Sequence, residues 1–191
     1  MFSLALSLAL STLSPALPAA SVTSGAAIAV CFSPEEDCAS FAARAIDNAK
    51  REILVGAYGL TTGSGIVEAL IRAKERGVDV RLIADNTTPC PHTSGIEPLA
   101  VAGVPVWIDA QAQIAHAKTM VIDGSVTLMG SMNWTRGAAA NSEDHNLVSS
   151  PTVAAAYATH WHARLATSVR YARREDWCRG SSSEVRLGAR L

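Results

Sequence analysis

The 191-residue sequence lacks the features of several protein classes. It contains no internal repeat, which excludes solenoids and repeat arrays. Charged residues make up only 17% of the chain and apolar residues 49%, which argues against disorder and allows a hydrophobic core. The same composition argues against collagen-like and coiled-coil structures. The length fits a single domain.

No charged side chain precedes Glu35. Residues 1–20 have an apolar stretch, Leu4 to Leu10, followed by small and helix-breaking residues, and they resemble a secretory signal peptide cleaved near Ala20. The amino-terminal part has no Lys or Arg, and polar residues and Pro15 interrupt the apolar run, which disfavours a stable membrane span. We expect a periplasmic or secreted protein, with an uncleaved N-terminal membrane anchor as the alternative.

Cysteine is scarce and shows no metal-binding spacing. The four cysteines are Cys31, Cys38, Cys90 and Cys178. An even number in an exported chain predicts two disulfides, with three possible pairings, and the first two cysteines bracket a turn short enough for a local bridge. There is no CxxC and no histidine at zinc-like spacing, so we predict neither a metal site nor a cofactor.

The net charge of −1 hides an uneven distribution. Residues 1–163 carry 9 basic and 14 acidic side chains, whereas residues 164–191 carry seven arginines and three acids. We expect a catalytic domain over residues 21–169 and a basic polar tail over 170–191. Such a tail suits a polyanionic partner, although a merely solvated tail explains it equally well.

Periodicity predicts alternating strands and helices in the first half of the chain. Strands are expected over Ala27–Phe32, Glu52–Tyr58, Val78–Ala84 and Val104–Ile108, and helices over 33–50, Ile66–Arg76 and Ile96–Ala102. This order is typical of a mixed α/β fold with a largely parallel sheet and helices on both faces. Further on, we expect strands over Ile114–Ile122, Ser125–Met129 and at 147–148, and a helix over Thr152–Val169.

Asp123-Gly124 predicts a two-residue hairpin between the strands at 114–122 and 125–129. On a strand, His116 and Lys118 project to the same face. A two-residue turn would place Ser131 directly opposite His116, with Asn133 on the loop that follows.

These side chains suit a phosphate group. Lys118 offers a positive charge, Ser131 and Asn133 offer neutral donors, and Gly130 allows close backbone approach. The imidazole of His116 can act as a nucleophile or a proton donor near neutral pH. The set therefore predicts phosphoryl transfer without a metal, whereas H-x-K alone would more often be an exposed hairpin.

The full string is far more specific than its parts. It reads His116-Ala-Lys118, four residues, Asp123, six residues, Gly130-Ser131-Met-Asn133, and it resembles the HKD motif of the phospholipase D superfamily at every position. The segments FSPEEDC, AIDNAKREILVGAYGLTT, ALIRAKERGVDVRLIAD, Trp134-Thr135 and Asn141-Ser142-Glu143 also resemble that superfamily. The resemblance covers about residues 27–164 and is closest to small bacterial Nuc-type endonucleases, which carry one motif per chain.

The resemblance implies a phospholipase D-like α-β-α sandwich in which two HKD motifs meet at one site. One histidine forms a phosphohistidine and the other protonates the leaving oxygen. Since this chain has a single motif, a homodimer that pairs two copies of His116 is implied. Lys118, Gly130, Ser131 and Asn133 would hold phosphate oxygens, and Glu143 matches the family acid that hydrogen-bonds an active-site histidine.

Four further residues, Asp123, His145, His160 and His162, are weaker candidates for the site. Asp123 is the aspartate of the motif, which we interpret first as a turn residue and second as catalytic. His145 is close to Glu143 in sequence, whereas His160 and His162 do not share a helix face.

Three functions are compatible with the sequence. The first is a metal-independent phosphodiesterase, an endonuclease of low sequence specificity acting on nucleic acid through a phosphohistidine. The second is a phospholipase D acting on phospholipid headgroups, since both substrates are phosphodiesters. The third is a non-catalytic nucleic-acid-binding module, against which the intact motif argues.

Overall fold

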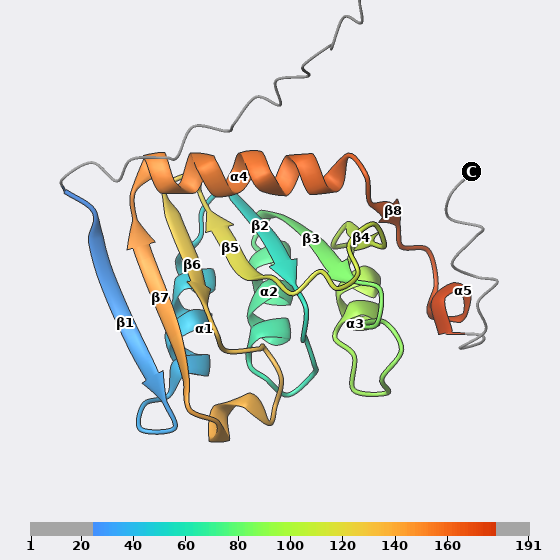
Figure 1. The fold of residues 1–191 in the computed structure, drawn as a ribbon, viewed down its shortest axis with the longest axis horizontal. Coiled ribbons are helices and arrows are strands. Elements are labelled where there is room, and N and C mark those ends of the chain that lie inside the picture. Colours follow the sequence, from blue (N-terminus) through green and yellow to red (C-terminus); the bar gives the residue numbers. More distant parts are fainter. Residues whose placement is uncertain (1–24, 179–191) are drawn as a thin grey trace, which may run out of the picture.

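A computed structural model describes residues 25–178 of the chain, so the expected signal peptide lies outside the described residues. These residues form an eight-stranded sheet in the order β1-β7-β6-β5-β2-β3-β4-β8 (Figure 1). The strands are β1 (Ala27–Ser33), β2 (Glu52–Ala57), β3 (Asp79–Asp85), β4 (Val106–Asp109), β5 (Lys118–Ile122), β6 (Val126–Gly130), β7 (Glu143–Ser149) and β8 (Val169–Arg170).

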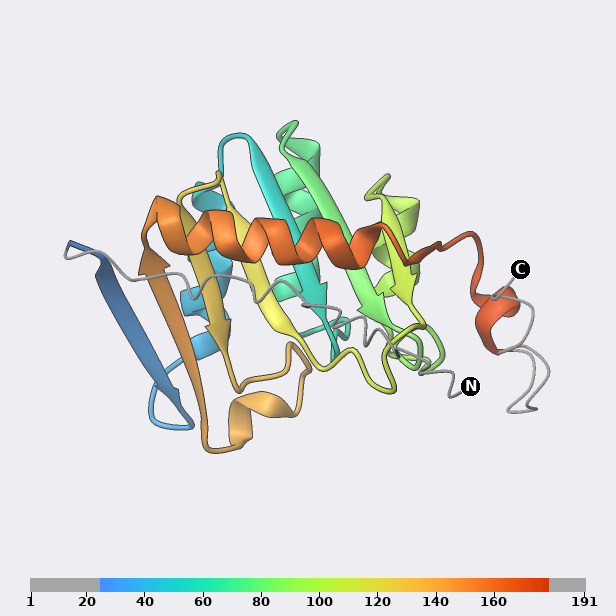
Figure 2. The same cartoon turned by 45° about the horizontal axis from the view of Figure 1, so that its top comes forward.

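Helices cover both faces of this sheet (Figure 2). On one face lie α1 (Cys38–Asn48), α2 (Ile66–Glu75) and α3 (Ile96–Val101), and on the other the long helix α4 (Pro151–Leu165) crosses β2 to β6. The short helices η1 (Ala138–Ala140) and α5 (Arg174–Cys178) belong to the loops. The predicted α-β-α fold class is confirmed. Within the described residues, no helix is both long and apolar enough to cross a membrane.

The sheet is less parallel than the sequence order predicts. Only the β2–β3 and β3–β4 pairings are parallel, and the other five are antiparallel. The reason is that β1 does not join the parallel group beside β2 and lies at the edge of the sheet. It pairs instead with β7, so that Ala27 lies opposite Ser149 and Ser33 opposite Glu143. The hairpin strands therefore enter the middle of the sheet rather than its edge.

The core lies mainly between the sheet and the α1–α3 layer. Strand β2 is buried over five of its six residues, as its nearly continuous apolar sequence predicts. Ile46 of α1 and Leu70 of α2 are fully buried against it. On the other face, Trp161 of α4 packs over Leu54 and donates a hydrogen bond to the carbonyl of Val55 (2.8 Å). These contacts hold rigid the strands that carry the candidate site.

The chain continues as part of the fold beyond residue 170. Strand β8 pairs with β4, Tyr171 is buried, and α5 is joined to the loop after β3 by the Cys90–Cys178 disulfide. The boundary predicted at residue 170 therefore lies too early, and residues 179–191 are outside the described part. The second bridge joins Cys31 to Cys38, so two disulfides are present. Disulfides are typical of an oxidising compartment such as the periplasm or the exterior.

The hairpin register differs by one residue from the prediction. Asp123 and Gly124 both have positive φ angles, and the Ser125 N–H donates to the carbonyl of Ile122 (3.1 Å), as in a type I′ turn. Ser125 is nevertheless left out of the ladder, because Ile122 pairs with Val126. This extra residue moves Ser131 out of the position directly opposite His116. The predicted pairing of these two residues is wrong.

Candidate active site

His116 and Lys118 lie where β5 begins, at the edge of the sheet where β2 and β3 end, which we call the site end. His116 precedes the strand and does not lie within it, contrary to prediction. The Nζ atom of Lys118 is 3.0 Å from both ring nitrogens of His116 and 3.2 Å from its carbonyl oxygen. The ring of Tyr58, just after β2, lies 4.4 Å from the imidazole between ring centroids. These three side chains form one packed cluster.

Lys118 is a buried cation with few compensating charges. The residue is 6% exposed, and its Nζ lies 5.1 Å from the centre of the Tyr58 ring. Burial lowers the pKa of its ammonium group, and the negative charge of Glu143 acts in the opposite direction. No carboxylate among the described residues lies within salt-bridge distance of it. An anionic ligand at this point would supply the missing counter-charge.

Ser131, directly after β6, and Glu143, the first residue of β7, lie at the same end of the sheet. The Ser131 hydroxyl donates to Oε2 of Glu143 (2.5 Å) and accepts from the backbone N–H of Asp144 (3.0 Å). Oε1 of Glu143 accepts from the amide of Asn141 (3.2 Å). Within the described chain Glu143 therefore binds Ser131 and Asn141, and no hydrogen bond to His116 is present. Its electrostatic effect on Lys118 links it to the cluster.

Gly130 allows β6 to lie very close to β7 just before Ser131. A Cβ atom here would lie 2.1 Å from the carbonyl oxygen of Asp144 on β7. The absence of a side chain at Gly59 likewise allows Asn133 to lie close to that backbone, because a Cβ on Gly59 would lie 3.0 Å from the Asn133 Oδ1. That Oδ1 is buried and has no hydrogen-bond partner among the described residues. Asn133 therefore keeps unused hydrogen-bonding capacity beside the cluster.

His145 is a buried residue that hydrogen-bonds within the core and is not part of the cluster at the site end. The residue is fully buried, its Nε2 accepts from the Trp134 indole (3.1 Å), and its Nδ1 lies 3.2 Å from the carbonyl of Cys38. Since the indole can only donate, Nε2 is the acceptor and Nδ1 carries the proton. Burial lowers the pKa of His145, which favours this neutral form.

Asp123 lies at the other end of β5 and does not join the cluster. Its carboxylate accepts three backbone N–H groups, from Lys50 (2.9 Å), Arg51 (2.7 Å) and Glu52 (3.1 Å). It thereby fastens the hairpin turn to the start of β2. The assignment as a turn residue is confirmed, and the catalytic alternative is not supported by its position.

Tyr58 and Asp85, which the motif does not include, help to position His116. Tyr58 packs on its ring, and Thr88 donates to the carbonyl of Tyr58 (2.5 Å). Asp85, at the end of β3, is 1% exposed, and its Oδ2 accepts the N–H of Ala115 (2.7 Å), the residue before His116. A polar residue directly after a buried strand was the available signal for Asp85.

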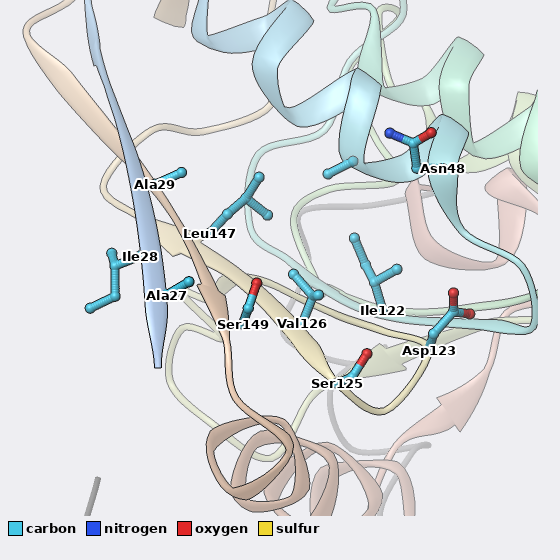
Figure 3. Close-up of a pocket in the computed structure, with 11 residues that line it drawn as sticks. Ala27, Ile28, Ala29, Asn48, Ile122, Asp123, Ser125, Val126, Leu147 and Ser149 are labelled. Carbon is cyan, nitrogen blue, oxygen red and sulfur yellow. The ribbon is translucent and has the colours of Figure 1, made fainter. Parts of the chain in front are cut away.

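The described residues contain no group of three His, Cys, Asp or Glu side chains that could hold a metal ion. A pocket of about 380 Å³ is present, but it lies at the opposite end of the sheet, between α1 and strands β1, β6 and β7 (Figure 3). Its lining is mostly apolar and includes Ala29, Ile122 and Leu147. The chemistry-bearing residues are thus gathered at the site end and not in this pocket.

Comparison with known proteins agrees with this arrangement. The family model described as "Cardiolipin synthase, PLD-like domain" matches residues 43–165. A phospholipase D of Rickettsia prowazekii is 34% identical over 142 residues, which are 74% of this chain and 69% of that protein. A mitochondrial cardiolipin hydrolase of Xenopus laevis is 39% identical over 88 residues, 46% of this chain and 42% of that protein.

Solved structures show the same architecture. The phospholipase D family member Nuc from Salmonella typhimurium has a TM-score of 0.72 and 30% identity, and the match covers 78% of this chain and all of Nuc. NucT from Helicobacter pylori has a TM-score of 0.70 at 19% identity, over 77% of this chain and all of NucT. At this low identity, the match to NucT shows a shared fold only.

Proposed function

This chain belongs to the phospholipase D family and is a phosphodiester hydrolase, and on that premise we propose that it is a metal-independent endonuclease of low sequence specificity. The observation that carries the proposal is the buried Lys118 ammonium, which lies against His116 without a carboxylate partner. Ser131 and Asn133 follow β6 at the same end of the sheet, and we propose that their side chains turn to the phosphate when the substrate binds. A cation and neutral donors around an imidazole are what a phosphodiester needs in order to bind and react.

The proposed reaction has two steps and needs two histidines. In the first, a ring nitrogen of one His116 attacks phosphorus, so that a P–N bond forms and the bond from phosphorus to the leaving oxygen breaks. The second His116 gives its proton to that oxygen. In the second step, this histidine takes a proton from water, whose oxygen attacks phosphorus and breaks the P–N bond. Lys118 and the neighbouring donors stabilise the charge on the phosphoryl oxygens in both steps.

Two copies of His116 require a homodimer. Edge strand β1 offers a surface for one, because Ile28 (61% exposed), Val30 (48%) and Phe32 (54%) alternate along it. The Cys31–Cys38 bridge turns Cys31 towards α1, so these three side chains lie on the opposite face of the sheet, where α4 packs mainly on strands β2 to β6.

This apolar row reaches the site end of the sheet. Phe32 pairs with Asp144, whose backbone N–H donates to Ser131. We propose a second copy of the chain as the partner that covers the row, because the single motif leaves the site incomplete without one.

A nucleic-acid substrate is favoured over a lipid by the extent of the structural match. The chain aligns with all of Nuc, and the motif resembles Nuc-type endonucleases. Phospholipid hydrolysis remains the second candidate, because the Rickettsia relative that aligns over most of this chain is named phospholipase D. The two disulfides support a periplasmic or secreted location reached through the N-terminal segment.

The proposal is tested with the full mature chain in EDTA on three substrates: bis-p-nitrophenyl phosphate, plasmid DNA and phosphatidylcholine vesicles. We expect cleavage of the first two. His116→Asn should lower turnover by about 10⁴ or more while leaving the fold and the dimer intact, because Asn can neither form a phosphohistidine nor transfer a proton. Circular dichroism and sedimentation are the controls. An active monomer, a requirement for magnesium, or preferential cleavage of the lipid would contradict the proposal.

A further inference from the structure

Arg136 is an exposed arginine on the rim of the site, in the loop that follows Asn133. Its guanidinium group makes no hydrogen bond or ion pair with any residue between 25 and 178. Many other arginines are engaged. Arg72 and Arg76 bind Asp47, Arg81 binds Asp79, Arg164 binds Asp109, and Arg51 and Arg174 bind backbone carbonyls. Within the described part of the chain, the Arg136 guanidinium thus has no polar partner, although its stem lies near Gly63.

The backbone of Arg136 is nevertheless fixed in place. Its N–H donates to the hydroxyl of Thr61 (3.0 Å), and the N–H of Thr61 donates to the carbonyl of Trp134 (3.0 Å). The N–H of Trp134 in turn donates to the carbonyl of Gly59 (2.9 Å), the residue after Tyr58. The rim loop is therefore joined to the segment that packs against His116. A guanidinium on this loop is presented to solvent from a rigid base.

The distance from the site suits a neighbouring phosphate. Arg136 follows Asn133 by three residues, so their Cα atoms are at most about 10 Å apart. One strand of B-DNA carries a phosphate about every 3.4 Å along its axis, so a polynucleotide held at Lys118 places further phosphates within reach of this side chain. A substrate with a single phosphodiester has no such group to offer.

We propose that Arg136 binds a phosphate next to the scissile one and so makes the enzyme prefer polynucleotides over small phosphodiesters. The inference rests on the proposed nuclease function. It predicts a contact that adds to substrate affinity and plays no part in bond cleavage. Arginine suits this task because its planar guanidinium donates two hydrogen bonds to one phosphate.

The test compares Arg136→Gln with the wild-type dimer on a thymidine dinucleotide, which has one phosphodiester, and on a longer oligothymidylate. For the oligomer we expect kcat/KM at low salt to fall about fivefold, through KM. The slope of log kcat/KM against log salt should become shallower by about 0.7, the loss of one phosphate contact on a single strand. Cleavage of the dinucleotide should stay unchanged. Arg136→Lys should retain most of the oligomer preference.

Lys50→Gln is the matched control, because it removes one positive charge from an exposed side chain at the opposite end of the sheet. An equal effect of both variants would overturn the proposal in favour of the overall charge. It would also be overturned by an unchanged salt slope in Arg136→Gln or by an equal loss on the dinucleotide. If the wild type cleaves bis-p-nitrophenyl phosphate but neither nucleotide, the proposed function fails and this inference fails with it.

Discussion

The aspartate of the HKD motif offers a sharp separation of stability from catalysis. In Asp123→Asn, the amide oxygen can still accept from Arg51 and Glu52, but the NH₂ group replaces the oxygen that accepts from Lys50. Asp123 has a φ of 53°, a left-handed conformation that Asn tolerates, so the exchange adds no backbone strain. The variant therefore changes the carboxylate and little else.

The expected loss follows from these contacts. A hydrogen bond to a charged group contributes about 1.5–3 kcal/mol, and here one bond is lost, the others lose their charge, and two donors face each other. Because Asp123 is only half-buried, solvent screening reduces the total. We expect the free energy of unfolding to fall by about 2–3 kcal/mol near neutral pH.

The pH dependence gives a second check on the same group. Burial opposes ionisation of Asp123, but the backbone donors and the charge of Arg51 outweigh it, so its pKa lies below the usual value. A depressed pKa stabilises the folded state above the unfolded value of about 3.9, and this contribution is lost as the pH falls through the folded pKa. The difference between the wild type and the variant should therefore shrink below about pH 4.

Urea unfolding followed by circular dichroism measures the stability, and turnover of bis-p-nitrophenyl phosphate well below the melting temperature measures catalysis. We expect kcat to stay within about threefold of the wild type, since Asp123 lies at the far end of β5 from Lys118. A variant with unchanged stability and a kcat reduced more than ~100-fold would refute the reasoning and return Asp123 to the reacting groups.

Three further changes have defined outcomes. Gly130→Ala should destabilise the fold by about 1–3 kcal/mol and lower kcat, because its Cβ would strike the carbonyl of Asp144; an unaltered melting temperature would contradict this. His145→Phe should cost about 2–5 kcal/mol in urea unfolding, since it leaves two buried hydrogen-bonding partners unsatisfied; a loss below 1 kcal/mol, the order of one ordinary bond, would argue against that network. Changing both Cys90 and Cys178 to Ser should cost about 4–5 kcal/mol by calorimetry, because the bridge closes a separation of 88 residues; a negligible loss would show that the bridge does not constrain the unfolded chain.

Local patterns in the sequence predict most of the elements. Of the motif residues, His116, Lys118 and Ser131 lie at the site end, whereas Asp123 lies at the other end of β5. Long-range features are where the predictions fail. Nothing near Ala27 indicates that β1 pairs with β7, because strand order depends on side-chain packing over more than 100 residues of chain. Asp123-Gly124 locates the turn, but dipeptide identity does not say whether Ser125 joins the ladder.

The supporting residues were missed for a related reason. Asp85 reads as an ordinary polar residue after a strand, and only the fold shows that its carboxylate holds the segment before His116. Tyr58 likewise belongs to an apolar strand pattern until its ring is seen against the imidazole. A motif names candidate reacting groups from their residue types and spacing, whereas the groups that orient them are defined by tertiary structure.

The place of β7 between β1 and β6 has a consequence for when activity can arise. A nascent chain that ends before Glu143 lacks both the partner strand of β1 and the carboxylate beside Ser131. The centre of the sheet, with His116 and Lys118, is made earlier but stays open on one flank until residue 149 has been synthesised. A phosphodiester hydrolase of this topology thus lacks a complete sheet for most of its own translation.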